Sequence, residues 1–284
     1  MTQFPGHQPV LFHSHALAVR KAHVSLATFE RSGVGDPVIF LHGLGSTKED
    51  FADAAFRPAL CDRHLLGLDF PGFGETECDD TSIVDVPFLV ETLEALLKKM
   101  AVTRCHLVGH SMGGLVAQLA AERLGPAVRV IVSIEGNLTP QDFLFSRCVE
   151  QFPHDPHGLL GELFERARAA NFPGAALYAT GLRHKLDPAI LPGLLRSLVA
   201  ISDTPGLIDR FVDLTCRRSL LVGQASVTSL SYLDWLRARS VPVRFIAESG
   251  HFPMYSNPQA MWAAIEAALD PTDFASSPSR HLLS

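Results

Sequence analysis

A serine stands at the centre of the stretch GHSMGG, residues 109–114, with a glycine two residues away on each side. The preceding CHLV favours a buried strand, and the following LVAQLAAERL favours a helix. A strand-to-helix turn this sharp strains the backbone of its central residue, and only small neighbours such as Gly109 and Gly113 let it close. The helix N-terminus then directs amide groups at charge developing on a bound carbonyl oxygen. The arrangement predicts that Ser111 is a nucleophile for acyl transfer.

Three more motifs lie along the chain: HGLG at 42–45, DFPGFG at 69–74 and SGHFPMYSNP at 249–258. In this order, together with GHSMGG, they make the sequence resemble the α/β-hydrolase family over roughly residues 17–269. The resemblance implies an α/β fold with an eight-stranded, mostly parallel sheet and an inserted helical cap over the active site.

The resemblance also assigns roles to single residues. It makes Ser111 the nucleophile and His251 the general base, because a serine hydroxyl needs a base within hydrogen-bond reach. The oxyanion hole would consist of the backbone N–H groups of Leu44 and Met112. His42 is expected to shape the oxyanion loop and not to act as a second base.

The acid that orients the histidine departs from the commonest family pattern. That pattern places it after the strand that follows the cap, where this chain has Ser226. A minority of the family, including zearalenone-hydrolysing lactonases, carries the acid after the sixth strand. Here the apolar stretch VRVIVSI ends in Glu135, and a carboxylate at the tip of a buried strand needs a partner. Glu135 is therefore the expected triad acid, with Asp142 in reserve, a structural role for Glu135 as one alternative and a Ser–His dyad as another.

Other polar clusters are interpreted without catalysis. Asp69 is expected to be a structural residue of the DFPGFG turn. The clusters HSH at 13–15 and HDPH at 154–157 lack a third and fourth ligand at supporting spacing. We therefore expect no metal and no cofactor.

Apolar runs and helical spacing alternate along most of the chain, which indicates a parallel sheet with right-handed crossovers. Helical patterns are expected near 48–60, 86–100, 115–124, 229–240 and 258–269. Between 138 and 213 the alternation stops and helical patches dominate. The expected organisation is a core domain of residues 1–137 and 214–284, with a helical cap of residues 138–213.

Composition excludes several classes of protein. The chain of 284 residues has a net charge of −6 and no basic stripe, which argues against nucleic acid as a partner. Five widely spaced cysteines without a Cys-x-x-Cys motif fit a reducing compartment. The N-terminus lacks a signal-peptide pattern, and no apolar run reaches the roughly 18 residues of a membrane span. A cytoplasmic location is expected, whereas monomer and dimer both stay open.

A serine nucleophile disfavours dehalogenation, for which the fold uses an aspartate, and favours hydrolysis of esters, lactones or thioesters. The cap sequence is apolar, so the expected substrate is a medium-sized hydrophobic ester or lactone. The residues that give the cap this apolar character include Phe143, Phe145, Phe152, Phe164, Phe172, Leu177, Tyr178, Leu182, Leu194 and Leu198. An acyltransferase or thioesterase, and a non-enzymatic ligand receptor of this fold, remain alternatives.

Overall fold

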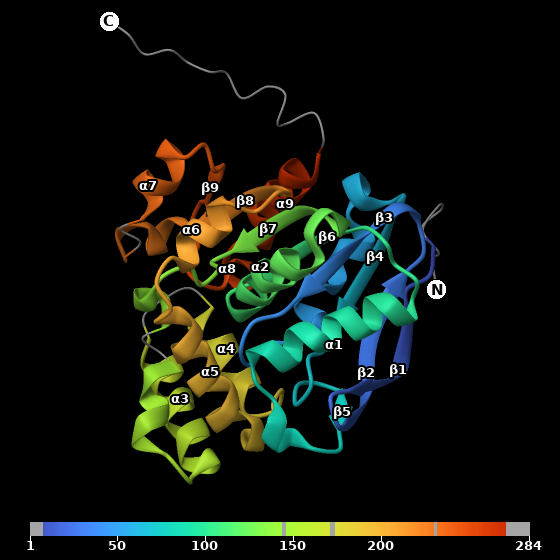
Figure 1. Cartoon of the computed structure of the whole chain (residues 1–284). Coiled ribbons are helices and arrows are strands. Elements are labelled where there is room, and N and C mark those ends of the chain that lie inside the picture. The colour runs from blue at the N-terminus through green and yellow to red at the C-terminus, as the bar shows by residue number, and fades with distance from the viewer. Residues whose placement is uncertain (1–7, 144–145, 171–173, 230–231, 271–284) are drawn as a thin grey trace, which may run out of the picture.

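A central sheet runs through the molecule, with helices packed on it (Figure 1). The computed structural model describes residues 8–143, 146–170, 174–229 and 232–270. The strand order is β1-β2-β4-β3-β6-β7-β8-β9, in which β1, β2 and β4 are antiparallel neighbours and the rest pair in parallel. The strands are β1 (Leu11–Val19), β2 (Ala22–Arg31), β3 (Val34–Leu41), β4 (Arg63–Leu68), β5 (Glu77–Cys78), β6 (Cys105–His110), β7 (Val128–Ile134), β8 (Arg217–Gly223) and β9 (Val243–Ile246).

The α/β fold with a mostly parallel sheet is confirmed, with one addition to the expected eight strands. The main path contains eight strands, and the two-residue β5 pairs with β2 outside that path. Two residues are too few to show a period-two pattern, so the sequence carries no signal for β5. Without β5, the strand β7 is the sixth along the chain.

Register brings the carboxyl ends of the central strands to one edge of the sheet. Leu41 pairs with Gly109, and His110 pairs with Ile134, which in turn pairs with Leu221. β6 is buried at every position, as expected for a parallel strand covered on both faces. The residues that follow these strands therefore lie beside one another, where ligand sites of open α/β sheets form.

Helices cover both faces of the sheet. In Figure 1, α1 and α2 lie on the viewer's side, and α9 packs against β7, β8 and β9 from behind. α1 begins after Asp85, whose carboxylate accepts a hydrogen bond from the N–H of Phe88 at 2.7 Å. The described α-helices are α1 (Val86–Lys99), α2 (Met112–Leu124), α3 (Pro156–Ala169), α4 (Ala175–Leu182), α5 (Leu191–Ser202), α6 (Leu207–Val212), α7 (Leu233–Ala238), α8 (Pro253–Ser256) and α9 (Pro258–Leu269).

Two of the expected helical stretches differ in kind or extent. Residues Lys48–Phe56 and Pro58–Leu60 form 3₁₀ turns, separated by Arg57. In the stretch 229–240, helix α7 covers only Leu233–Ala238, and residues 230–231 lie outside the described part. None of the helices in the described ranges is long and apolar enough to cross a membrane.

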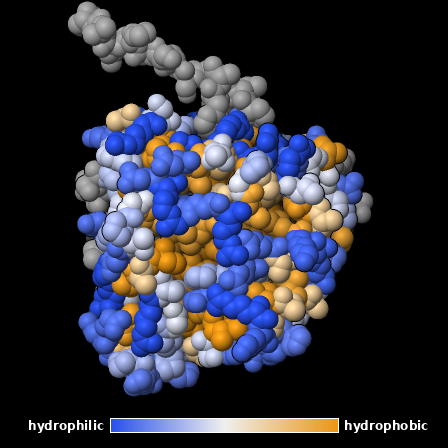
Figure 2. Space-filling model, viewed as in Figure 1, coloured by the Kyte–Doolittle hydropathy of each residue, from blue (hydrophilic) through white to orange (hydrophobic). Residues whose placement is uncertain are grey.

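The regular elements described in the segment 138–213 are helices and 3₁₀ turns joined by loops, apart from an isolated β-bridge between Leu186 and Phe73. The helices α3, α4 and α5 form a separate layer beside the sheet (Figure 1). Backbone hydrogen bonds attach it to the DFPGFG turn, from Gly74 N–H to Lys185 O and from Asp187 N–H to Gly72 O. Figure 2 shows hydrophilic side chains over α3, with apolar side chains gathered across the middle of this face. The function of this segment as a cap stays a prediction.

Candidate active site

Ser111 occupies a strained turn between β6 and α2. Its backbone angles are φ 50° and ψ −118°, which a residue with a side chain rarely adopts. A Cβ atom at Gly109 would lie 2.3 Å from the carbonyl oxygen of Gly113, and one at Gly113 would lie 2.2 Å from that of Leu41. Both glycines are thus required for the turn to close, as the motif predicts.

The structure brings Ser111, His251 and Glu135 together from three separate loops. Ser111 Oγ lies 3.1 Å from His251 Nε2. On the other side of the imidazole, His251 Nδ1 lies 3.4 Å from Glu135 Oε2. The Glu135 side chain is 4 % exposed, whereas that of His251 is 36 % exposed. A hydroxyl, an imidazole and a buried carboxylate therefore follow one another in a line.

The peptide around Glu135 fixes its carboxylate. The backbone has a positive φ of 49°, and its N–H donates to Leu221 O at 2.8 Å. Oε1 accepts a hydrogen bond of 2.6 Å from the N–H of Gly223, at the end of β8. The bond to Gly223 uses one carboxylate oxygen and leaves the other facing His251. The buried charge at this strand tip therefore has a backbone donor on one side and an imidazole on the other.

Asp142, the reserve acid, has different partners. Its Oδ2 accepts the N–H groups of Leu138 and Thr139, both at 2.8 Å, and the hydroxyl of Thr139 at 3.1 Å. Burial raises the pKa of its carboxyl group. Among the described residues, no hydrogen bond or ion pair joins Asp142 to His251. Asp142 closes the loop after Glu135, and its interaction with His251 is electrostatic and not a hydrogen bond.

The residues expected to form the oxyanion hole, Leu44 and Met112, both line the cavity that contains Ser111. His42 holds the loop that carries Leu44. Its Nε2 accepts the N–H of Phe70 at 2.9 Å, so Nδ1 carries the proton and donates to Gly43 O at 2.8 Å. Burial lowers the pKa of His42. With both ring nitrogens engaged by the backbone, His42 shapes the loop and is not available as a base.

A cavity of about 280 Å³ opens beside Ser111. Its apolar lining residues are Leu44, Met112, Ala167, Ala170, Tyr178, Leu198 and Phe252. Arg166 and Asp142 add charged groups at its wall. Of the apolar cap residues expected from the sequence, Tyr178 and Leu198 line this cavity, whereas Leu177 is 61 % exposed. Phe145 and Phe172 lie outside the described residues, as does the side chain of Phe143.

Two site residues were not anticipated. Asn137 Oδ1 lies 3.4 Å from Ser111 Oγ, and His110 donates from Nε2 to the backbone oxygen of His251 at 2.7 Å. Burial, followed by the charge of His251, lowers the pKa of His110 to about 3, so this ring is neutral at working pH. His110 lies within GHSMGG, but its partner is 141 residues away in sequence. Only the folded chain reveals either contact.

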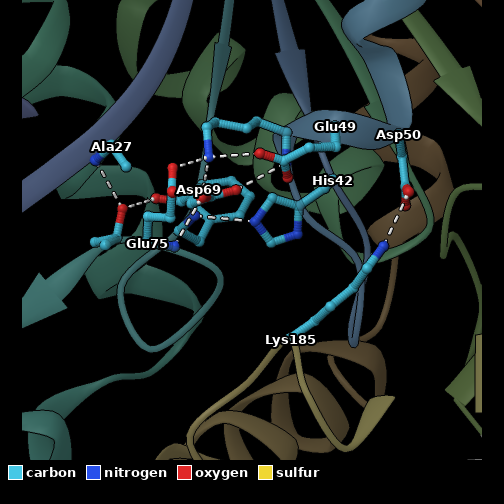
Figure 3. Close-up of polar contacts among 10 residues, drawn as sticks. Ala27, His42, Glu49, Asp50, Asp69, Glu75 and Lys185 are labelled. Carbon is cyan, nitrogen blue, oxygen red and sulfur yellow. Dashed lines mark hydrogen bonds and ion pairs between the residues drawn. The ribbon is translucent and has the colours of Figure 1, made fainter. Parts of the chain in front are cut away.

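Asp69 belongs to a second polar cluster, which Figure 3 shows. The carboxylates of Glu49, Asp69 and Glu75 converge there as a metal site would require. The ammonium of Lys48 lies among them, 2.7 Å from Glu49 and 2.8 Å from each of the other two. Lys48 supplies the positive charge that these carboxylates need, so the cluster is a structural ion-pair network of the DFPGFG turn.

The sequence pattern of the alpha/beta hydrolase family matches residues 38–264, which is most of the chain. The chain belongs to this family. The turn at Ser111, the glycine-rich loop at 42–45 and the histidine loop at 249–258 all lie within the matched residues.

Curated relatives match only part of this family member. An sn-1-specific diacylglycerol lipase of Xenopus laevis is 32% identical over 126 residues, 43% of this chain and 39% of the lipase. A pimeloyl-[acyl-carrier protein] methyl ester esterase of Aeromonas hydrophila is 38% identical over 109 residues, 37% of this chain and 41% of the esterase. The matches thus span about two-fifths of the length of these relatives.

Solved structures match over almost the whole chain at low identity. A thermophilic esterase from Thermogutta terrifontis has a TM-score of 0.66 at 20% identity, covering 90% of this chain and 96% of the esterase. An N-acyl homoserine lactonase bound to N-hexanoyl homoserine has a TM-score of 0.69 at 13% identity, covering 90% of this chain and 95% of the lactonase. These likenesses establish the shared fold.

Proposed function

We propose that this family member is a serine hydrolase that cleaves carboxylic esters or lactones through an acyl-enzyme. The observation that carries the proposal is the line from Ser111 Oγ to His251 Nε2, at 3.1 Å, and on from Nδ1 to Glu135, at 3.4 Å. An unbound site is expected to show such contacts somewhat long, because they tighten when substrate binds.

In the acylation step, Ser111 Oγ attacks the carbonyl carbon of the substrate while His251 Nε2 takes the hydroxyl proton. The negative charge that forms on the carbonyl oxygen would be stabilised by the N–H groups of Leu44 and Met112. One such donor is worth about 3 kcal/mol of barrier. Glu135 stabilises the positive charge of the imidazolium and holds it in orientation. His251 then returns the proton to the departing alkoxide.

In the deacylation step, water replaces the alcohol and the same groups act in reverse. His251 removes a proton from water, which attacks the acyl carbon, and the bond to Ser111 Oγ breaks as the proton returns to the serine. A lactone follows the same route, except that its alcohol stays attached to the acyl group.

The substrate class follows from the cavity and is consistent with the relatives. A mainly apolar space of about 280 Å³ suits a medium-sized hydrophobic acyl group. Relatives and fold neighbours include a diacylglycerol lipase, a methyl ester esterase and a lactonase, whose names refer to ester bonds. We further propose that residues 138–213 act as a cap over this space. The cytoplasmic location stays a prediction.

Hydrolysis of p-nitrophenyl esters of increasing acyl length, together with aliphatic lactones, tests the proposal. Wild type and Ser111→Ala are compared at equal concentrations of folded protein. Loss of the nucleophile should reduce kcat on the order of 10⁴-fold or more, because the rest of the triad is useless without it. Equal rates for the two proteins on every substrate would refute a serine hydrolase. Product analysis with added alcohol distinguishes hydrolysis from acyl transfer.

A further inference from the structure

Two hydrogen-bond acceptors converge on the nucleophile. Ser111 Oγ lies 3.1 Å from His251 Nε2 and 3.4 Å from Asn137 Oδ1. A serine hydroxyl has one hydrogen, so it can satisfy only one of them fully at a time. The proposed triad of Ser111, His251 and Glu135 gives the imidazole a role, but it gives no role to the amide of Asn137.

The amide of Asn137 has a fixed orientation. Its Nδ2 donates to the backbone oxygen of Asp142 at 3.0 Å, which turns Oδ1 toward Ser111. The carboxylate of Asp142 in turn accepts the N–H groups of Leu138 and Thr139, so the loop is tied at both ends. Asn137 is only 6% exposed and lines the cavity. A buried acceptor held this way is preorganised toward the reacting centre.

We propose that Asn137 positions the water that hydrolyses the acyl-enzyme, an inference that rests on the proposed function. Once Ser111 is acylated, Oγ has lost its hydrogen, and His251 Nε2 and Asn137 Oδ1 both face a point that offers no donor. A buried acceptor such as Asn137 Oδ1 is costly without a donor. One water molecule carries two hydrogens and satisfies both acceptors at once. Its oxygen then lies beside the acyl carbon bonded to Oγ.

Hydrolysis of the acyl-enzyme then needs only this water molecule, His251 and Ser111. The water oxygen forms a bond to the acyl carbon, and the hydrogen directed at His251 passes to Nε2. The hydrogen directed at Asn137 stays on the water oxygen, which becomes the hydroxyl of the product acid. As the tetrahedral intermediate collapses, the bond from carbon to Oγ breaks, and His251 returns its proton to Ser111. Asn137 neither donates nor accepts a proton in this step.

The test separates acylation from deacylation in the Asn137→Leu variant, which keeps the approximate size of the side chain and removes the acceptor. Stopped-flow release of p-nitrophenol gives the acylation burst, and the later steady rate gives deacylation. The expected result is a burst close to wild type and deacylation about ten-fold slower. Added hydroxylamine, a stronger nucleophile that does not need a positioned water, should restore turnover and form the hydroxamate.

Thr139→Val is the matched control, because it removes a hydrogen bond of the same loop without touching Ser111. The ratio of burst rate to steady rate should stay as in wild type. If Asn137→Leu slows acylation and deacylation equally, or if Thr139→Val reproduces its pattern, the amide is structural and the proposal is wrong. An unchanged deacylation rate in Asn137→Leu would also overturn it.

Failure of the underlying function shows separately. In that case wild type gives no burst or steady release above Ser111→Ala, and the water-positioning role falls with the hydrolase. With Ser111-dependent turnover in wild type, the results for Asn137→Leu judge the role of Asn137 alone.

Discussion

Two buried carboxylates each follow the end of a central strand, Asp69 after β4 and Glu135 after β7, and their surroundings differ. The Asp69 side chain is fully buried, and its oxygens accept the backbone N–H and the ammonium of Lys48 and the N–H of Glu75. Glu135 has one oxygen bound to the Gly223 N–H, while the other faces an imidazole at 3.4 Å. The first partner is a permanent cation, and the second becomes one only on protonation.

The difference indicates how the fold separates structure from chemistry. Asp69 is saturated by donors and paired with a full charge, so it can stabilise one geometry and do little else. Glu135 is fixed by one backbone bond and directed at a group whose charge changes during turnover. A carboxylate of the second kind gains its interaction energy when His251 takes a proton, which is the condition for lowering a barrier.

The largest effect on stability is expected from Lys48→Met. The substitution leaves Asp69 as a buried carboxylate without a counter-ion, and breaking such a pair costs about 3–5 kcal/mol of unfolding free energy. Urea unfolding followed by circular dichroism measures the loss. Activity per folded molecule should change little, because Lys48 belongs to the structural network around Asp69. A stability within about 0.5 kcal/mol of wild type would show that the network is not structural.

The two regions should also respond to opposite ends of the pH range. Burial opposes the charge of Lys48, but hydrogen bonds to Asp69, Glu49 and Glu75 outweigh it and raise the pKa of Lys48. The contribution of this pair is thus complete below the ordinary lysine pKa of about 10.4 and is lost only as the pH rises through the folded value. The Asp69 cluster should therefore resist moderate alkali.

The histidines of β6, the strand that precedes Ser111, should instead make the protein less stable in acid. Burial lowers the pKa of His106 to about 4 and that of His110 to about 3. Below about pH 6.5 these histidines are therefore protonated in the unfolded chain but not in the folded chain. The free energy of unfolding decreases as the pH is lowered. By pH 5 the loss is on the order of 1–2 kcal/mol per histidine. Urea unfolding at several pH values should show a weaker acid dependence in His106→Gln, and an identical dependence would contradict this assignment.

A smaller effect is expected where the helical segment 138–213 meets the core. Lys185 Nζ lies 3.2 Å from Asp50 Oδ1, and Asp50 also accepts the hydroxyl of Tyr255 at 3.0 Å. The Lys185 side chain is partly exposed, and Asp50 keeps Tyr255, so Lys185→Met should cost about 1 kcal/mol or less. Thermal unfolding measures this change in stability. A loss as large as that of Lys48→Met would mean that the Lys185–Asp50 contact is as important for stability as the network around Asp69.

Much of the fold could be predicted from the sequence because its signals are local. The buried strands and the glycines around Ser111 act within a few residues, so hydrophobic pattern and turn chemistry suffice. Glu135 could also be identified as a candidate acid from local sequence, because it is a charged residue directly after an apolar strand. Two features could not be predicted in this way. The helical pattern near residue 48 does not distinguish a 3₁₀ helix from an α-helix, and the strand β5 is too short to show a period.

The rest of the site depends on contacts between distant segments. Lys48 meets Asp69 across 21 residues, and Asn137 meets Ser111 across 26. The choice between Glu135 and Asp142 depends on which carboxylate keeps an oxygen beside the imidazole once its backbone hydrogen bonds are made, a matter of loop geometry that residue type does not reveal. Such relations follow from tertiary packing and have no sequence period.

The measurement that tests the contrast most directly pairs Glu135→Gln with Asp69→Asn. Each replaces a buried carboxylate by its amide, and each variant is assayed for kcat/KM and for unfolding free energy. We expect Glu135→Gln to lose about 10³–10⁴-fold in kcat/KM with little loss of stability. Asp69→Asn should lose about 1–3 kcal/mol of stability, because Lys48 keeps Glu49 and Glu75 as partners, while the folded fraction keeps its activity. Near-wild-type hydrolysis by Glu135→Gln would contradict the account and return the search for the acid to Asp142.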